Sequence, residues 1–396
     1  MICLPAACQG IQSDTELKEV QEEKKHYTEL SIDADIPAGN IVFEKIKNDT
    51  VYVHQDLRDT SGDWFYWAFR VCGAQGKKLT FIFNRSEAVG VRGPIVSFDS
   101  GATYDYVTVS GLTRNKFTYT FPSDAEEVWM YECFPYLPSM WDAFVSGIQE
   151  KTFKKGVLCK SPKGVDVPYI KIGSGKYDIL LSARHHCSEA SADYVLEGVI
   201  SAFAEDSELG RILRRRLTLT VVPFVDIDGS IAGDQGKNRK PHDHNRDYTE
   251  FLYPETAALA ALMTELKPRI FVDVHCPWLY GHYNEFIYTP WKELSLGVKE
   301  ANEKRFSSLI EKNQDGGLNY KASDDLPYGV SWNSNTNYSL GASSVRWALA
   351  NIPSLDVCRS LEVPFQNANG AKVTPEALRG FGHGFASALL EFAMSR

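Results

Sequence analysis

Residues 178–189 have the sequence Asp-Ile-Leu-Leu-Ser-Ala-Arg-His-His-Cys-Ser-Glu, an apolar run that ends in reactive polar side chains. The run predicts a buried strand over 178–183, and a helical pattern follows over 190–203. Residues 217–224 and 269–274 are two further apolar, β-rich runs, again separated by a helical pattern. Strands that alternate with helices are typical of an α/β sheet with helices on both faces.

The same alternation continues to the carboxyl end of the chain. Helical patterns are predicted over 209–215, 254–266, 291–312 and 375–394, and a strand is predicted to end within 360–363. We therefore expect residues 131–396 to form one α/β domain with a mixed central sheet.

The chain before this domain has a different texture. Short β-rich runs separated by turn residues occupy 40–44, 50–53, 64–71 and 79–83. They predict a small antiparallel β-sandwich over 27–130. Residues 1–26 are expected to form a polar leader.

Composition excludes several classes of protein. The 396 residues include 42 Lys and Arg against 51 Asp and Glu, so the net charge is −9, which argues against a nucleic-acid partner. No apolar stretch approaches about 18 residues, so no transmembrane segment is expected. The eight cysteines are scattered without a CxxC pair, which argues against a zinc ribbon or a disulfide framework. Nothing in the sequence indicates an oligomeric state.

The compartment is open at this stage. The chain as given is compatible with a cytoplasmic protein. Residues 4–8, Leu-Pro-Ala-Ala-Cys, are similar to the end of a bacterial lipoprotein signal, although only seven residues precede Cys8. An exported lipoprotein is the alternative if these residues are the end of a truncated signal.

Two short patterns carry metal-ligand chemistry. His186 and Glu189 are three residues apart at the start of a predicted helix, and His275 ends a predicted strand. A catalytic zinc takes three protein ligands of these types and keeps one open position. Each pattern alone also fits an interpretation without a metal. The first would be a loop histidine with a first-turn glutamate, and the second an ordinary buried histidine.

A long basic loop lies between these patterns. Residues 237–246 read Lys-Asn-Arg-Lys-Pro-His-Asp-His-Asn-Arg. Arginine grips a carboxylate in a bidentate fork, so the loop is a candidate for substrate binding. A solvated basic loop is the alternative.

The order of these motifs resembles that of the zinc metallocarboxypeptidases, the carboxypeptidase A-like family. The motifs are HxxE, the Asp-x-Asn-Arg loop, the strand-end histidine and Ser360-Leu361-Glu362. The resemblance covers roughly residues 131–396. With the β-domain in front and Cys-Phe-Pro-Tyr at 133–136, the chain is most similar to the cytosolic-carboxypeptidase branch and its bacterial relatives.

The resemblance implies a set of catalytic roles. His186, Glu189 and His275 match the ligands of one Zn²⁺ ion. Glu362 matches the general base that activates the zinc-bound water. Arg239 matches the arginine that polarises the scissile carbonyl.

The resemblance also implies substrate contacts. Asn245 and Arg246 match the pair that binds the free terminal carboxylate of a peptide, and Asp243 matches the aspartate that orients the first zinc histidine. Tyr338, nine residues before Trp347, matches the capping tyrosine.

Specificity is left open by the sequence. Val345 falls at the floor of the side-chain pocket and favours an apolar C-terminal residue, whereas Arg346 would favour an acidic one. The further basic residues of the deglutamylating branch are not found near this segment. Ser188 stands where the family often has arginine, so upstream contacts differ.

Three other polar residues have two interpretations each. Asp273 shares a strand face with His275 and could hold it or be a structural acid. His242 and His244 could lie at the edge of the metal site or be exposed loop histidines. His185 competes with His186, but only His186 has the HxxE spacing.

We therefore expect a metallocarboxypeptidase that removes the C-terminal residue of a peptide. The alternatives are a zinc amidohydrolase or peptidase acting on cell-wall peptides or acylated amino acids, and a catalytically degenerate binding module.

Overall fold

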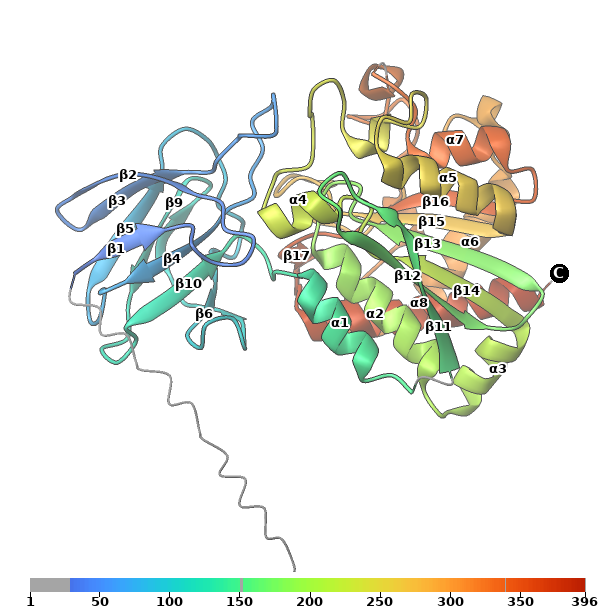
Figure 1. The fold of residues 1–396 in the computed structure, drawn as a ribbon, viewed down its shortest axis with the longest axis horizontal. Helices are drawn as coiled ribbons and strands as arrows, with labels where there is room; N and C mark the ends of the chain where they lie inside the picture. The colour runs from blue at the N-terminus through green and yellow to red at the C-terminus, as the bar shows by residue number, and fades with distance from the viewer. Residues whose placement is uncertain (1–28, 150–151, 339, 396) are drawn as a thin grey trace, which may run out of the picture.

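The structure is a computed structural model that describes residues 29–149, 152–338 and 340–395. The expected leader and the Leu-Pro-Ala-Ala-Cys stretch at 4–8 lie outside these residues. Figure 1 shows a small β-rich part beside a larger part in which helices surround a sheet. Loops from the two parts meet between them.

The small part consists of two five-stranded sheets whose apolar sides form one core. One sheet has the order β1 (Ser31–Asp33), β4 (Ala68–Cys72), β10 (Glu127–Tyr131), β6 (Ile95–Ser97) and β7 (Asp105–Tyr106). The other has the order β2 (Val42–Lys47), β3 (Thr50–His54), β5 (Lys78–Phe83), β9 (Lys116–Thr120) and β8 (Ser110–Thr113). The ring of Phe69 in β4 lies 5.6 Å from that of Phe81 in β5, joining the sheets. One pair, β3 and β5, is parallel, so the sandwich is not purely antiparallel.

The larger part is built on a six-stranded mixed sheet. Its order is β11 (Phe153–Lys160), β12 (Asp166–Gly173), β14 (Leu217–Val222), β13 (Tyr177–Ala183), β15 (Ile270–His275) and β16 (Val357–Glu362). The last four strands in this order are parallel, and β11 and β12 are antiparallel to their neighbours. Every residue of β14, β15 and β16 is buried, as expected for parallel strands that are covered on both faces.

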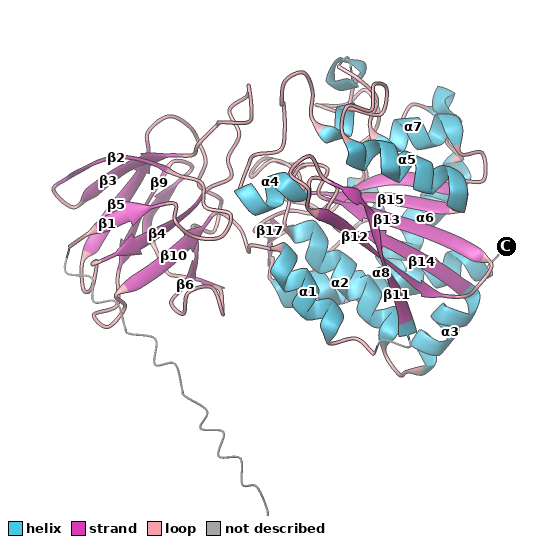
Figure 2. Cartoon of the chain, viewed as in Figure 1, coloured by secondary structure: helices cyan, strands magenta, loops and turns pink. Residues whose placement is uncertain are grey.

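Helices lie on both faces of this sheet (Figure 2). On one face α2 (Ser191–Ala204), α3 (Glu208–Arg216), α6 (Glu300–Asn313) and α8 (Pro375–Met394) form contacts with one another and with the strands. On the other face lie α5 (Pro254–Leu266) and α7 (Ser344–Asn351). The remaining short elements are α1 (Pro138–Ser146), α4 (Ile227–Ala232) and the hairpin of β17 (Asn367–Ala368) and β18 (Ala371–Lys372). The mixed sheet with helices on both faces confirms the expected fold class.

One predicted helix begins later than its sequence pattern indicates. A helix is predicted from Trp291, but α6 starts at Glu300. The Trp291 N–H donates instead to the carbonyl of Leu326 (2.9 Å), which holds residues 290–292 extended. A backbone partner 35 positions further along the chain thus overrides the local helical pattern.

The parallel strands bring their carboxyl ends to one edge of the sheet. His275 at the end of β15 lies directly opposite Glu362 at the end of β16. Residues 185–189 follow β13 at the same edge. Ligand sites of open α/β sheets lie at this edge.

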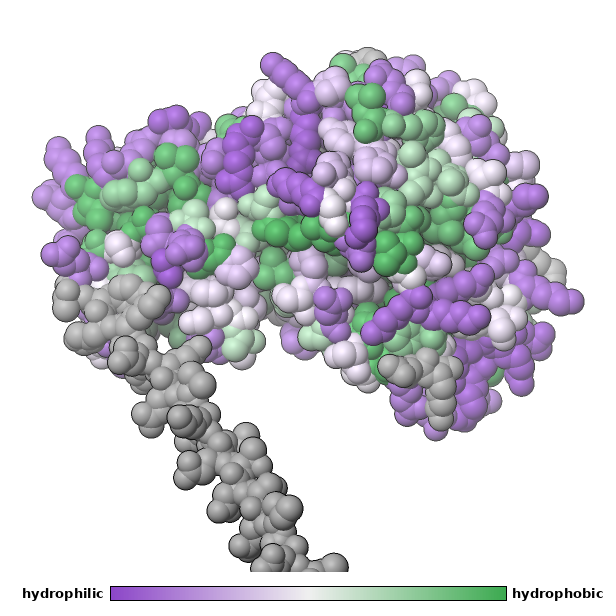
Figure 3. Space-filling model, in the orientation of Figure 1, coloured by the Kyte–Doolittle hydropathy of each residue, from purple (hydrophilic) through white to green (hydrophobic). Residues whose placement is uncertain are grey.

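The outer surface carries no candidate membrane span in the described part of the chain, because no helix there is long and apolar enough to cross a bilayer. On the face drawn in Figure 3, hydrophilic side chains cover much of both parts and hydrophobic side chains are interspersed among them.

Candidate metal centre

Two histidines and one glutamate converge at the sheet edge. The Nδ1 atoms of His186 and His275 each lie 2.7 Å from a different carboxylate oxygen of Glu189. All three side chains are buried, and their potential ligand atoms lie within 4.8 Å of one another. His186 and Glu189 come from one turn after β13, whereas His275 arrives from β15, so the tertiary fold assembles the group.

The second nitrogen of each histidine faces a carboxylate. His275 Nε2 lies 2.7 Å from Asp273 Oδ2, and His186 Nε2 lies 3.6 Å from Asp243 Oδ1. Such outer carboxylates fix the tautomer and the ring orientation of metal-binding histidines. The Nδ1 atoms are therefore the ones that face a shared ligand.

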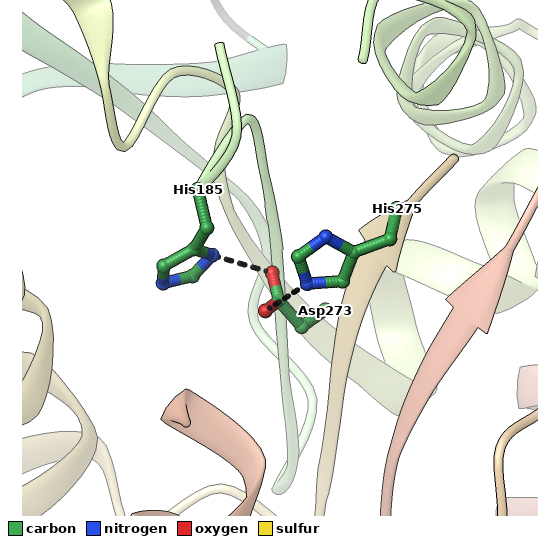
Figure 4. Close-up of side chains that lie close together, drawn as sticks. All are labelled: His185, Asp273 and His275. Carbon is green, nitrogen blue, oxygen red and sulfur yellow. Dashed lines mark hydrogen bonds and ion pairs between the residues drawn. The ribbon is translucent and has the colours of Figure 1, made fainter. Parts of the chain in front are cut away.

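A third histidine, His185, lies on the other side of the Asp273 carboxylate from His275 (Figure 4). Its Nδ1 lies 2.8 Å from Asp273 Oδ1 and its Nε2 lies 2.7 Å from the hydroxyl of Tyr248. Ser182 and Ser344 donate their hydroxyl protons to the two oxygens of Asp273. His185, Asp273 and His275 also meet the spacing of a metal site, but the hydrogen bonds of this group are already made. The arrangement favours Asp273 as a support for His275.

The electrostatics of the first group suit a bound cation. Burial opposes ionisation of Glu189, but the imidazoles of His186 and His275 hold the pKa of its carboxyl well below the usual range. Burial also opposes a charged His275, yet Asp273 and Glu189 raise the pKa of its imidazole. Positive charge is thus favoured between these carboxylates, and two histidines with one carboxylate are a donor set that catalytic zinc takes. His186, Glu189 and His275 therefore fit a zinc ion.

A cavity of about 30 Å³, here called the central cavity, opens beside His186 and His275. It is lined by His186, Lys237, Asn245, Arg246, His275, Pro290, Lys292, Trp332, Asn337, Ser343, Ser360 and Glu362. Burial raises the pKa of Glu362, and the charge of His275 opposes part of that rise. A carboxylate that is only 8% exposed and lies opposite His275 in the sheet can accept a proton from a reacting water.

The Asn-Arg pair also lines the central cavity and lies in the short turn η2 (His244–Arg246). Asn245 accepts the backbone N–H of Ser344 (3.1 Å), which orients its amide. The guanidinium of Arg246 donates to the carbonyl (3.0 Å) and to the side-chain oxygen (3.2 Å) of Asn337. These two oxygens stand where the two oxygens of a carboxylate could bind.

Arg239 lies outside the central cavity. Its guanidinium forms ion pairs with Asp59 (3.0 Å), Asp226 (2.5 Å) and Asp234 (3.3 Å). It lines a different cavity, of about 240 Å³, together with His244, among other residues. The structure therefore does not bring Arg239 together with the other predicted site residues, because three carboxylates hold it elsewhere.

Two lysines line the central cavity that sequence reasoning did not single out. Lys237 lies in the basic loop, two residues before Arg239, and its residue type does not distinguish it from the other cations of that loop. Lys292 lies in the extended stretch where a helix was predicted from Trp291. No signal in the sequence marks Lys292, since its place depends on the pairing with Leu326.

Two of the expected pocket residues, Val345 and Arg346, do not line the central cavity. Val345 is fully buried in α7. Tyr338 is the last residue of the turn η5 (Asn335–Tyr338), and its side chain lies outside the described part of the chain. The pocket wall is formed instead by residues such as Ser343 and Lys292.

The loop histidines are buried, which corrects the interpretation of them as exposed. His242 Nε2 lies 2.7 Å from Asp247 Oδ1, and the ring of His244 stacks on Tyr253 with 3.8 Å between centroids. Burial, the largest effect, lowers the pKa of His244 to about 4. Both side chains therefore shape the loop that carries Asp243 and the Asn-Arg pair.

Comparison with known proteins agrees with this geometry. No protein-family model matches the sequence. Cytosolic carboxypeptidase 3 of Mus musculus is 27% identical over 189 residues, which are 43% of this chain and 19% of that relative. The metallo-carboxypeptidase of Burkholderia cenocepacia has a similar structure, with a TM-score of 0.76, 18% identity, and 93% of this chain and 100% of that chain covered. A metallo-carboxypeptidase of Pseudomonas aeruginosa, in complex with (2-guanidinoethylmercapto)succinic acid, has a TM-score of 0.72 and 18% identity over 91% of this chain and 98% of that chain.

The protein thus has the fold of the metallo-carboxypeptidases. Its relatives in sequence are cytosolic carboxypeptidases, of whose length the matched region spans only a fraction.

Proposed function

We propose that the protein is a zinc-dependent carboxypeptidase that hydrolyses the C-terminal peptide bond of a peptide. The observation that carries this proposal is that His186, His275, Glu362 and Arg246 line one cavity, with Glu189 between the two histidines. The two histidines and Glu189 supply the ligand set, Glu362 a buried base, and Arg246 a cation for a free carboxylate.

Each group has a defined task in such a reaction. A bound zinc ion acidifies water and polarises a carbonyl group. Glu362 takes a proton from the attacking water and returns it to the nitrogen of the departing amine. Because burial raises the pKa of Glu362, the resulting acid holds that proton closer to neutral pH and delivers it to the amine. Asp243 and Asp273 hold the rings of His186 and His275.

The free C-terminus of the substrate is recognised when its carboxylate replaces Asn337 as the hydrogen-bond partner of Arg246. A substrate carboxylate takes the place of the two Asn337 oxygens, and Asn245 adds an amide donor. A cavity of about 30 Å³ holds a few waters at most, so side chains that line it, Asn337 among them, rearrange when a peptide binds.

Replacing Arg246 by alanine tests this recognition. We expect KM for a free-acid peptide to rise by at least about 30-fold, because loss of one partner of a desolvated charge pair costs roughly 2–5 kcal/mol. The measurement is steady-state hydrolysis of a peptide and its C-terminal amide, and the amide should be a poor substrate of both proteins. Arg211→Ala, at an exposed arginine in α3, serves as the control. An unchanged KM would show that Arg246 does not bind the substrate carboxylate. It would favour the alternative in which the enzyme recognises an acylated amino acid by another part of the substrate.

We further propose that the C-terminal residue removed is acidic. Lys292 is only 6% exposed and places a positive charge in the wall of the central cavity. Digestion of a peptide library should show glutamate or aspartate as the preferred last residue. Lys292→Met should lower kcat/KM for such peptides by about 10-fold or more, the worth of one hydrogen bond to a charged group. Peptides that end in leucine should be hydrolysed at least as fast by this variant, and a preference that stays unchanged contradicts the assignment.

A further inference from the structure

The loop that precedes the Asn-Arg pair is tied to the β-sandwich. One carboxylate oxygen of Asp59 accepts the backbone N–H of Gln235 (2.9 Å). Its other oxygen accepts the N–H of Gly236 (2.8 Å) and the Nε–H of Arg239 (3.0 Å). Because Asp59 lies between β3 and β4, a residue of the amino-terminal sandwich fixes the backbone just before position 237 and the Arg239 side chain just after it.

The Lys237 side chain contacts an aromatic residue of the sandwich, Trp64. Its Nζ lies 4.9 Å from the centroid of the Trp64 ring, a cation–π contact. Trp64 packs edge to face against Trp278 at 4.8 Å, which anchors this ring to the loop after β15. The backbone N–H and the hydroxyl of Ser61 both donate to the carbonyl of Asn238.

The same loop packs closely against residues 187–188, which directly follow the candidate ligand His186. Gly236 has a φ of +76°, and a Cβ there would lie 2.3 Å from the backbone nitrogen of Cys187. The hydroxyl of Ser188 donates to the carbonyl of Gln235 (2.9 Å). Only glycine permits this approach, and it brings the next residue, Lys237, beside His186.

These contacts give different surroundings to Lys237 and Arg239, two cations of the same loop. Arg239 is neutralised by three carboxylates and lines the other cavity, whereas Lys237 lines the central cavity with His186 and Glu362. We propose, on the basis of the proposed function, that Lys237 stabilises the oxyanion of the reaction. In this assignment Arg239 and Asp59 are positioning residues that present the loop.

The step balances without a proton from Lys237. The oxygen of the attacking water bonds to the carbonyl carbon while Glu362 accepts a water proton. The π electron pair of the carbonyl moves to its oxygen, which becomes negative. The ammonium of Lys237 stabilises that charge with a hydrogen bond. When the C–N bond breaks, the pair returns to the carbonyl and Glu362 passes its proton to the amine.

Lys237→Met is the first test, with Lys237→Arg as the conservative variant. We expect kcat to fall by about 10²–10³ with little change in KM, as for loss of one oxyanion donor. Lys237→Arg should recover most of the rate. Lys240→Met removes an equal charge from an exposed position in the same loop and is the control.

A binding measurement separates this role from a structural one. The probe is a phosphinic dipeptide isostere, whose anionic tetrahedral phosphorus stands for the reacting carbon, and its Kd is measured by calorimetry. Lys237→Met should weaken this binding by a similar factor while zinc content and binding of the amino-acid product stay unchanged. Equal Kd values in the variant and the parent overturn the inference and leave the proposed function intact. A parent protein that neither binds the isostere nor hydrolyses peptides overturns both.

Trp64 tests whether the sandwich acts through Lys237. Trp64→Leu should lower kcat by about 3- to 10-fold, the size of one partly exposed cation–π contact, and Trp64→Phe should restore part of it. In the Lys237→Met background, Trp64→Leu should cost nothing more, because the two residues act as one unit. Additive losses contradict the coupling.

Discussion

Glu362→Gln is expected to lower kcat by at least about 10³-fold while the protein keeps its fold and its zinc. The amide has the shape of the carboxylate but cannot accept a proton from water, and a positioned general base contributes roughly 10²–10⁴ in rate. The measurement is single-turnover hydrolysis of a free-acid peptide, together with zinc analysis and a thermal unfolding curve.

The same substitution at Glu285 is the matched control. Glu285 is a partly buried acid that does not line the central cavity, and its carboxylate accepts from Asn367 instead. Glu285→Gln should leave kcat within a few-fold of the parent. Undiminished hydrolysis by Glu362→Gln would remove Glu362 from the role of base and reopen the interpretation of the fold as a binding module.

Glu189→Gln is expected to abolish zinc binding and, with it, hydrolysis. The two oxygens of Glu189 bridge the Nδ1 atoms of His186 and His275, so the amide replaces one ligand oxygen with a donor that faces an imidazole nitrogen. Loss of an outer partner alone costs 10- to 100-fold in metal affinity, so the loss of this direct ligand should exceed about 100-fold. Zinc per chain after dialysis, and a competition titration with a chromophoric chelator, measure the change.

Glu362→Gln doubles as the control for this experiment. It should keep one zinc per chain and lose turnover, whereas Glu189→Gln should lose both. Removal of zinc from the parent by a chelator should abolish hydrolysis, and added zinc should restore it. Full zinc content in Glu189→Gln would assign the metal to the other histidine group, His185, Asp273 and His275.

Several parts of the fold follow from local patterns. The helices over 254–266 and 375–394 have the predicted limits, since proline at the first turn and a continuous apolar face mark them in the chain itself. The strands that end near residues 183 and 274 are also marked locally, by mainly apolar runs. Ligand spacing within one turn, as in His186 and Glu189, is likewise a short-range property.

Local patterns do not predict the surroundings of three cations, Lys237, Arg239 and Lys292. Arg239 fits a catalytic arginine by its place in the motif, but its carboxylate partner Asp59 comes 180 positions earlier. Lys292 enters the cavity only because a pairing with a distant segment holds its backbone extended.

By itself, the sequence determined most of the strand and helix pattern, the class of the larger sheet and the residue types of the candidate metal ligands, because each depends mainly on neighbours within one or two turns. Only the tertiary structure decided which cation faces the cavity, which carboxylate supports each histidine, and that the amino-terminal sandwich holds part of the site. Charge and residue type are local, but whether a cation is neutralised or available depends on partners brought together by the fold.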